Sequence, residues 1–303
     1  MKKLSYLLSI FILFFFSACV SQKPASKLKE ISARSQDHFE CWYDGIIHDF
    51  IVDLPQEPAG APLVIMLPGW GDSAESMRII TCFSDTANPR GYAVAYITGA
   101  KSKYERSGTV SWNSGIAAKG NDDVGFLVAM AEYLQGEYGF DREHTYAVGF
   151  SNGAFMTHRL AMEAGETFAA CVSVGGFMPE KIWNERRIKN NVSFFQVTGE
   201  FDDVVPKHSD GTSSHSKIPA IEDVMLYWAT SNNLYALEAC PIGMGSSLVK
   251  WTYADEDRPQ TGRQPQVWNL VIKDGRHSWP EKRFSGIEIN PLILDFFDEI
   301  SGK

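Results

Sequence analysis

Gly149-Phe150-Ser151-Asn152-Gly153 is the stretch that decides how the rest of the chain is interpreted. It places a serine between two glycines where a β-prone segment, residues 145–148, gives way to a segment with helical spacing, residues 154–162. A sharp strand-to-helix turn strains the backbone of the serine, and glycines on both sides avoid collisions with the neighbouring strand and helix. The stretch therefore predicts a nucleophile elbow, and the alternative is an ordinary turn in a glycine-rich loop.

The first 18 residues have the features of a secretory signal peptide. Two lysines follow the initiating methionine, and an apolar run extends from Leu4 to Phe16. This run is too short to span a bilayer as an ordinary helix, and it ends in Ser17-Ala18-Cys19, which resembles a bacterial lipobox with Cys19 as the lipidated residue. Because such signals usually carry leucine where Phe16 stands, cleavage without lipidation is the alternative, and a retained membrane anchor is a weaker third option. We expect export, with the chain held at a bacterial membrane through Cys19 or released to the periplasm or the exterior.

Composition predicts one folded domain behind a flexible tether. Residues 21–36 are rich in Lys, Ser, Ala and Pro without sustained periodicity, so we assign residues 19–38 to a tether and residues 39–303 to a single domain with no internal repeat. Its length is ample for one large α/β core. Without residues 1–18 the chain has 26 basic and 37 acidic residues, a formal charge of −11, which argues against nucleic acid as a partner.

Four cysteines follow Cys19 in the chain, and their spacing fits no zinc site. Cys171 lies in an apolar run, where a free thiol behaves as a small hydrophobic group. At most one disulfide can then form among Cys41, Cys82 and Cys240, and the sequence does not fix which pair. The chain also has no His-Glu-x-x-His motif, no phosphate-binding glycine loop and no nucleotide fingerprint, so we expect neither a metal nor a cofactor.

Alternating apolar runs and helical stretches predict a mostly parallel sheet with helices on both faces. The runs expected to be strands buried on both faces are residues 63–67, 92–97, 192–197 and 267–272. The stretches expected to be helices are residues 122–135, 221–232 and 291–300. In such sheets the chemistry gathers at the carboxyl ends of the strands.

The serine needs a base, and in this architecture the acid and then the histidine follow it along the chain. His158 is two helical turns from Ser151, about 10 Å along the helix axis, which is too far. His208 and His215 lie in a serine-rich loop and are interpreted as solvated. His277 follows the last expected strand by a tight turn, so we predict that it is the base, the alternative being a surface histidine.

The acid is expected in residues 197–206, which follow the preceding strand and contain Glu200, Asp202 and Asp203. One of these carboxylates would orient and stabilise the imidazole. Chemistry alone does not separate Asp202 from Asp203, because adjacent side chains point in different directions.

The tetrahedral intermediate needs two backbone N–H donors. Asn152, the residue after the serine, supplies the first donor. The second is expected in the glycine-rich residues 67–72, where we assign the Trp70 amide, with Gly71 as the alternative. Ser73 is placed to cap the helix that follows.

Three tryptophans fall in segments expected near the carboxyl edge of the sheet: Trp70, Trp112 and Trp279. Their indole rings would suit stacking on an aromatic acyl group or on the face of a sugar, and a buried packing role is the alternative for each. Asp122 and Asp123 open an expected helix, where carboxylates favour the dipole, and we interpret both as structural.

Seven short motifs occur in order along the chain: His48-Asp49-Phe50-Ile51-Val52, Leu67-Pro68-Gly69, Trp112-Asn113, Asp122-Asp123-Val124-Gly125-Phe126-Leu127, Gly149-Phe150-Ser151-Asn152-Gly153-Ala154, Gly199-Glu200-Phe201-Asp202-Asp203-Val204-Val205-Pro206 and Gly275-Arg276-His277-Ser278-Trp279-Pro280. In these motifs the chain resembles secreted esterases of the polyhydroxybutyrate depolymerase and feruloyl esterase type, and the resemblance extends over most of the mature domain. The resemblance implies an α/β-hydrolase fold, Asp202 as the acid because it stands fourth before a proline, and His277 as the base because it precedes x-Trp-Pro. The chain differs from the family pattern at Pro68, where a histidine is usual, and at Glu200.

The resemblance and the expected triad of Ser151, Asp202 and His277 together imply a serine esterase that works through an acyl-enzyme intermediate. We expect feruloyl or acetyl esters of plant polysaccharide as substrates, and the family also implies polyester cleavage. A peptidase of the prolyl-oligopeptidase type would share the elbow but would normally carry a propeller domain. A non-catalytic lipoprotein that keeps the scaffold for binding is the alternative of a different class.

Overall fold

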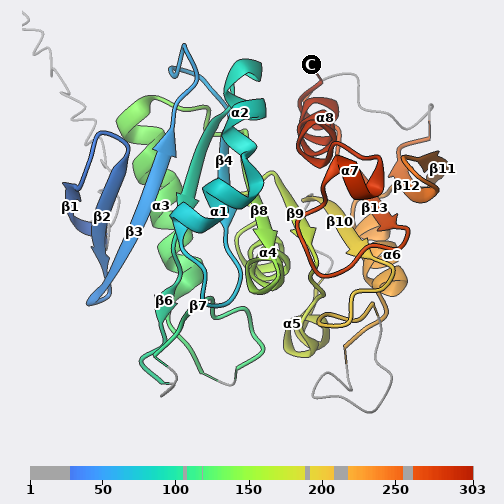
Figure 1. Ribbon diagram of the computed structural model, residues 1–303, viewed down its shortest axis with the longest axis horizontal. Helices are drawn as coiled ribbons and strands as arrows, with labels where there is room; N and C mark the ends of the chain where they lie inside the picture. Colours follow the sequence, from blue (N-terminus) through green and yellow to red (C-terminus); the bar gives the residue numbers. More distant parts are fainter. Residues whose placement is uncertain are drawn as a thin grey trace, which may run out of the picture.

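A large twisted sheet runs through the molecule, with helices on both of its faces (Figure 1). The computed structural model describes residues 28–104, 108–117, 119–187, 192–207, 218–254 and 262–302. Within these ranges the sheet has eleven strands, in the spatial order β1-β2-β3-β5-β4-β8-β9-β10-β13-β12-β11.

The middle of the sheet is parallel and its two edges are antiparallel. The parallel strands are β5 (Ala93–Ile97), β4 (Leu63–Leu67), β8 (Thr145–Phe150), β9 (Ala170–Val174), β10 (Ser193–Gly199) and β13 (Val267–Ile272). One edge is formed by β3 (Ile46–Asp53), β2 (His38–Tyr43) and β1 (Leu28–Ala33), and the other by β12 (Ser246–Thr252) and β11 (Ala236–Ile242). A separate short ribbon joins β6 (Ala100–Lys101) to β7 (Val110–Ser111). The predicted strands are therefore all present.

Successive side chains of the central strands enter two different cores, which explains why these strands are continuous apolar runs. Leu63, Ile65 and Leu67 of β4 face one core, whereas Val64 and Met66 face the other. The first core is closed by α3 (Asp123–Tyr138), α4 (Asn152–Glu163) and α6 (Ile221–Ser231), and the second by α1 (Ala74–Thr81), α2 (Phe83–Ala87) and α8 (Ile289–Ser301). Shorter helices are α5 (Glu180–Glu185), α7 (Lys282–Ser285) and a 3₁₀ turn at Asn88–Arg90.

Local signals fix the helix boundaries near the functional end of the sheet. Ser73 caps α1 by accepting the Ser76 backbone N–H at 3.2 Å, as predicted. Asp122 caps α3 by accepting the Gly125 N–H at 3.1 Å. Helix α3 extends three residues beyond its predicted end and closes at Gly139, which has a left-handed φ of 71°.

The folded domain begins earlier than predicted, so the assignment of residues 19–38 to a tether is wrong from residue 28 onward. Strand β1 pairs with β2, and Leu28 and Ile31 both reach the core. A β-bulge between Lys29 and Ser32, with Glu30 at φ 50°, places these two apolar side chains three residues apart on one face. The bulge removes the period-two alternation that would have marked a strand in the sequence.

The predicted signal peptide, residues 1–18, and Cys19 lie outside the described residues. Among the residues that are described, no helix is both long and apolar enough to cross a membrane. The four cysteines there are free thiols, and Cys171 is buried in β9 as predicted.

Trp228 joins helix α6 to the sheet, because its buried ring stacks on Phe194 of β10 with centroids 5.2 Å apart and planes 2° apart. We expect Trp228→Ala to lower the free energy of unfolding by about 3–5 kcal/mol, since the helix cannot collapse into the space left behind. Leu226→Ala on the exposed side of the same helix is the control and should cost less than about 0.5 kcal/mol. Equal losses in urea unfolding would contradict this packing.

Candidate active site

Ser151 occupies the turn between β8 and α4, with a strained backbone of φ 52° and ψ −115°. The flanking glycines are needed for space. A Cβ on Gly149 would collide with the Gly153 carbonyl, and a Cβ on Gly153 would collide with the Leu67 carbonyl at the end of β4. The predicted strand, turn and helix are all present, and the elbow presents the serine hydroxyl beyond the carboxyl end of the sheet.

The structure brings the three predicted catalytic side chains together. His277 Nε2 lies 3.0 Å from Ser151 Oγ, and His277 Nδ1 lies 2.8 Å from Asp202 Oδ2. A proton on Nδ1, donated to the carboxylate, leaves Nε2 free to accept the serine proton. The Asp202 carboxylate is almost wholly buried and His277 is slightly exposed, so the histidine can meet a substrate while its partner is shielded from water.

Asp202, and not Asp203, faces the histidine. Its second oxygen, Oδ1, accepts the backbone N–H groups of Val204 at 3.0 Å and Val205 at 2.7 Å, which fixes the carboxylate in its loop. Asp203 is exposed, and Glu200 accepts the Asp274 N–H at 3.1 Å. Asp203 is therefore a solvated carboxylate, and Glu200 stabilises the neighbouring turn.

The other histidines after the serine do not reach the site, or lie outside the described residues. His158 is buried in α4, where its Nε2 lies 3.2 Å from Gln196 Oε1 and its ring stacks on Phe194. Burial lowers the pKa of His158 to about 3, so this ring is neutral. His208 and His215 belong to a segment that the structure does not describe.

Aromatic packing holds His277 over the sheet. Its ring stacks on Phe150 with centroids 5.1 Å apart, and Gly175, the residue after β9, leaves room for it. Trp279 packs edge-on against Phe150, is only 6% exposed, and donates its indole N–H to Asn290 Oδ1 at 3.1 Å. We therefore correct the predicted substrate contact of Trp279 to a packing role beneath the histidine.

The two residues predicted to supply oxyanion donors belong to segments that meet at the serine. Asn152 is the first residue of α4, so its N–H is one of the unpaired donors at a helix N-terminus. Gly69 lies so close to Ser151 that an added Cβ would be 3.4 Å from the serine Cβ. The alternative donor, the Gly71 N–H, is bonded to the Val110 carbonyl at 2.9 Å, so the Trp70 N–H stays the predicted second donor. The Trp70 ring is 60% exposed and can contact substrate.

Trp112 is only 4% exposed, so the prediction that its ring contacts substrate is corrected as well. Its indole Nε1–H donates to the Pro68 carbonyl at 3.1 Å, and its backbone N–H donates to Asn152 Oδ1 at 2.7 Å. Sequence reasoning missed this side-chain role of Asn152, because only the fold brings residue 152 beside residue 112.

A buried carboxylate supports the segment that carries Trp112. Asp123 Oδ2 accepts the Asn113 N–H at 2.6 Å, and Arg159 donates to the Asn113 carbonyl at 2.5 Å. Burial raises the pKa of Asp123 to about 6, against the opposing effects of the Asn113 bond and the Arg159 charge. Asp123 is structural, as predicted, but its carboxylate holds the loop at Asn113 rather than interacting with the dipole of α3.

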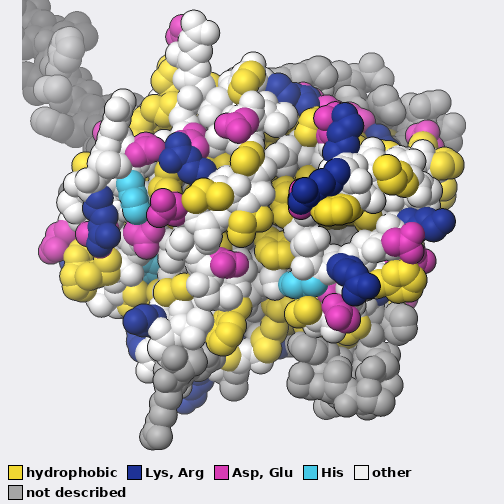
Figure 2. All heavy atoms as spheres, viewed as in Figure 1, with side chains coloured by type: hydrophobic (Ala, Val, Ile, Leu, Met, Phe, Trp, Pro, Cys, Tyr) yellow, Lys and Arg dark blue, Asp and Glu magenta, His cyan; other side chains and the backbone are white. Residues whose placement is uncertain are grey.

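A cavity of about 510 Å³ adjoins the triad at His277, the one triad residue in its wall. It is lined by His277, by the exposed ring of Phe284, and by Lys273 and Arg276. Figure 2 shows the face of the molecule on which α1 and α7 lie. Hydrophobic side chains are exposed in the middle of this face, between α1 and α7, with charged side chains around them.

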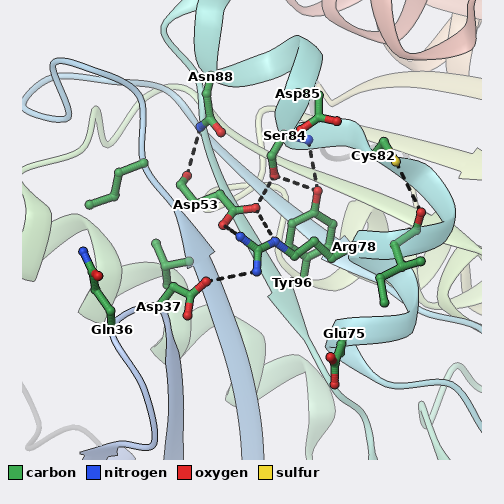
Figure 3. A pocket seen from close by; sticks show the side chains of 13 residues that line it. Gln36, Asp37, Asp53, Glu75, Arg78, Cys82, Ser84, Asp85, Asn88 and Tyr96 are labelled. Carbon is green, nitrogen blue, oxygen red and sulfur yellow. Dashed lines mark hydrogen bonds and ion pairs between the residues drawn. The ribbon is translucent and has the colours of Figure 1, made fainter.

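A larger cavity of about 780 Å³ contains no residue of the triad (Figure 3). Its centre is the Arg78 guanidinium, which contacts Asp53 at 2.5 and 2.9 Å and Asp37 at 3.0 Å. Ser84 also donates to Asp53 at 2.6 Å. Because these groups bond one another, the cluster ties α1 and α2 to β3. In the described part of the chain, His, Cys, Asp and Glu side chains form no group of three that could hold a metal ion.

The raised pKa of Asp123 makes stability depend on pH. The protonated form is favoured in the folded protein, so this contribution is complete below about pH 4 and is lost as the pH rises through about 6. Between pH 4.5 and pH 7.5 this loss amounts to about 2 kcal/mol, and we expect Asp123→Asn to remove it. Urea unfolding of both proteins at pH 4.5 and 7.5 measures it. The variant should gain on the wild type at the higher pH, and a difference that does not change with pH would contradict the assignment.

Comparisons of the sequence with known proteins find similarity to one esterase family and to one esterase-like relative. Residues 52–182 match the sequence profile of a family described as esterase PHB depolymerase. A relative named "Putative esterase NocK", from Nocardia uniformis subsp. tsuyamanensis, is 30% identical over 247 residues, which cover 76% of this chain and 69% of that protein.

Two solved structures show the same fold at low sequence identity. The acetyl xylan esterase from Aspergillus awamori has a TM-score of 0.58 at 13% identity, over 83% of this chain and 94% of that one. The Bacillus cereus carboxylesterase has a TM-score of 0.51 at 13% identity, over 83% and 93%. The chain thus has the α/β-hydrolase fold and belongs to the esterase PHB depolymerase family.

Proposed function

We propose that this esterase cleaves carboxylic esters through an acyl-enzyme intermediate on Ser151. The observation that carries the proposal is the continuous contact from Ser151 Oγ through the His277 ring to the buried Asp202 carboxylate. A serine hydroxyl becomes an effective nucleophile when a neighbouring base takes its proton, and this arrangement supplies the base and the group that orients it.

In the first half of the reaction, Ser151 Oγ attacks the ester carbonyl carbon while its proton passes to His277 Nε2. The resulting imidazolium is stabilised by Asp202, 2.8 Å from Nδ1. The negative charge that develops on the carbonyl oxygen is met by the N–H groups of Asn152 and Trp70. Collapse of the tetrahedral intermediate expels the alcohol, which takes the proton from Nε2.

In the second half, water replaces the alcohol and regenerates the enzyme. His277 Nε2 accepts a proton from the water as its oxygen attacks the acyl carbon, and a second tetrahedral intermediate forms in the same oxyanion hole. The proton then returns to Ser151 Oγ as the acid product leaves. His277 can serve both halves because it is in contact with the serine and also lines the open cavity.

As substrates we propose feruloyl or acetyl esters of plant polysaccharide. The exposed Trp70 ring, which follows Gly69 on the loop that approaches the serine, and the Phe284 ring at the cavity rim suit contacts with an aromatic acyl group or a sugar face. The structural neighbour from Aspergillus awamori is described as an acetyl xylan esterase, which is consistent with this choice. A polyester depolymerase is the second candidate, and the description of the family favours it.

For location we propose export, with Cys19 as the lipid-bearing residue. The support is the run of apolar residues from Leu4 to Phe16 followed by Ser17-Ala18-Cys19. Residues 20–27 would then separate the lipid from the first strand of the sheet, β1.

Neighbouring carboxylates offer a matched test of the mechanism. We expect Asp202→Asn to lower kcat on an aryl acetate by about 10²–10⁴-fold, because the histidine loses the charge that stabilises its protonated form. Asp203→Asn, one residue away and exposed, should stay within about twofold. Ser151→Ala should lose at least about 10⁴-fold. Wild-type rates in Ser151→Ala would refute the mechanism, as would total inactivity of the wild type on every ester, which would favour the non-catalytic alternative.

A substrate panel distinguishes the two candidate functions. Release of ferulate and acetate from substituted xylan should exceed release of acid from short polyhydroxybutyrate oligomers at equal enzyme concentration. Phe284→Ala should raise KM for the feruloyl ester more than for the acetyl ester, because the larger acyl or sugar group depends on the cavity rim. Product release from the polyester alone, measured by chromatography, would overturn the polysaccharide assignment.

A further inference from the structure

We propose that Trp112 is a positioning residue that holds both donors of the oxyanion hole in one geometry, a role that rests on the ester hydrolysis proposed above. The residue lies beneath the site and its side chain has almost no exposure, so it acts through its hydrogen bonds and not by touching substrate. Two independent bonds from Trp112, one from the backbone and one from the indole, connect the two halves of the oxyanion hole.

The first connection runs to Asn152. The side-chain amide of Asn152 pairs with the backbone of Trp112: Oδ1 accepts the Trp112 N–H at 2.7 Å, and Nδ2 lies 3.4 Å from the Trp112 carbonyl. Asn152 is itself buried at the start of α4. The residue that offers the first oxyanion donor through its backbone therefore also fixes Trp112 through its side chain.

The second connection runs to the loop that carries the other donor. The Trp112 indole donates to the Pro68 carbonyl at 3.1 Å, and Gly71 donates to the Val110 carbonyl at 2.9 Å. These bonds fix the loop on both sides of Trp70. Proline has no N–H of its own, so the carbonyl is the backbone group through which Pro68 can be held.

The segment that carries Trp112 is held from behind. Its next residue, Asn113, is bonded through its N–H to Asp123, through its carbonyl to Arg159, and through its side chain to the Asn121 carbonyl at 2.7 Å. Helices α3 and α4 thus give Trp112 a rigid base. A residue fixed in this way can set the distance between two loops rather than follow their movements.

Oxyanion donors act only when they meet the developing charge at hydrogen-bond distance, and a displacement of about 1 Å can cost on the order of 10²-fold in rate. Without the indole bond the Pro68 carbonyl is no longer held, so the loop can shift and move the Trp70 N–H away from its position. Because the charge exists in the transition state and not in the bound ester, the loss should appear in kcat more than in KM.

The experiment removes the indole N–H donor of Trp112 while keeping an aromatic side chain at that position. Trp112→Phe should lower kcat on an aryl acetate by about 10–100-fold with KM within about twofold. It should also weaken, by a similar factor, the binding of a trifluoromethyl ketone, which forms a tetrahedral oxyanion on Ser151. The matched control is Trp268→Phe in β13, which removes another buried indole bond, to Gln266 Oε1 at 2.7 Å, and should leave kcat within about twofold.

A second variant tests the other half of the bridge. Asn152→Ala keeps the backbone donor but removes the side-chain pair with Trp112, so it should lower kcat and ketone affinity in the same pattern. In the double variant the fold-loss in kcat should be smaller than the product of the two single fold-losses, since both substitutions break the same connection between the two donors. If Trp112→Phe does not fold, Asn152→Ala decides the question alone.

The outcomes separate this role from simple packing. Unchanged kcat and ketone affinity in folded Trp112→Phe, or in Asn152→Ala where only that variant folds, would refute the positioning role even if thermal stability falls. An equal loss of kcat in Trp268→Phe would also refute it. Full esterase activity in Ser151→Ala is a different failure, because it removes the proposed function itself.

Discussion

The close approach of helix α4 to the end of strand β4 is the constraint on which the rest of the site depends. At this point Gly153 touches the Leu67 carbonyl and Gly149 touches the Gly153 carbonyl, so neither position admits a side chain. The contact forces Ser151 into a positive φ and places its hydroxyl beside the loop that begins at Pro68. One backbone contact thereby brings Ser151 and the loop of a predicted oxyanion donor together, and the loops after the adjacent strands β10 and β13 carry Asp202 and His277.

Rigid surroundings keep these groups in place. The Asp202 carboxylate is fixed by two backbone N–H groups, the His277 ring by Phe150, and the Pro68 loop by Trp112. The His277 ring and the Pro68 loop are supported from other elements, whereas Asp202 is held within its own loop. The geometry of the site is therefore a property of the whole sheet edge, and it is prepared before substrate arrives, which is how hydrogen-bond donors and charges lower a barrier without reorganisation.

The sequence predicted the architecture and the three central residues well, for identifiable physical reasons. Strands buried on both faces produce continuous apolar runs, and the elbow requires glycines beside the serine. Both features can therefore be recognised in the sequence. The choice of Asp202 over Asp203 came from the family resemblance, because side-chain direction within a loop is set by bonds to Val204 and Val205 that a sequence does not display.

Three predictions failed or were incomplete for related reasons. Trp112 and Trp279 looked like substrate platforms because they lie near the sheet edge, yet burial depends on contacts with residues distant in sequence, such as Pro68 and Asn290. The first strand resembles a tether in sequence because its β-bulge hides the alternation. Periodic patterns report regular structure, whereas bulges and side-chain bridges are set by the tertiary fold.

The central claim is that Ser151, activated by His277, is the nucleophile. Treating the protein with a fluorophosphonate and mapping the modified peptide by mass spectrometry tests this claim most directly. The account predicts one adduct, on Ser151, whose formation slows by orders of magnitude when His277 is replaced by alanine. An adduct on another residue, or labelling of Ser151 at an unchanged rate without His277, would contradict it.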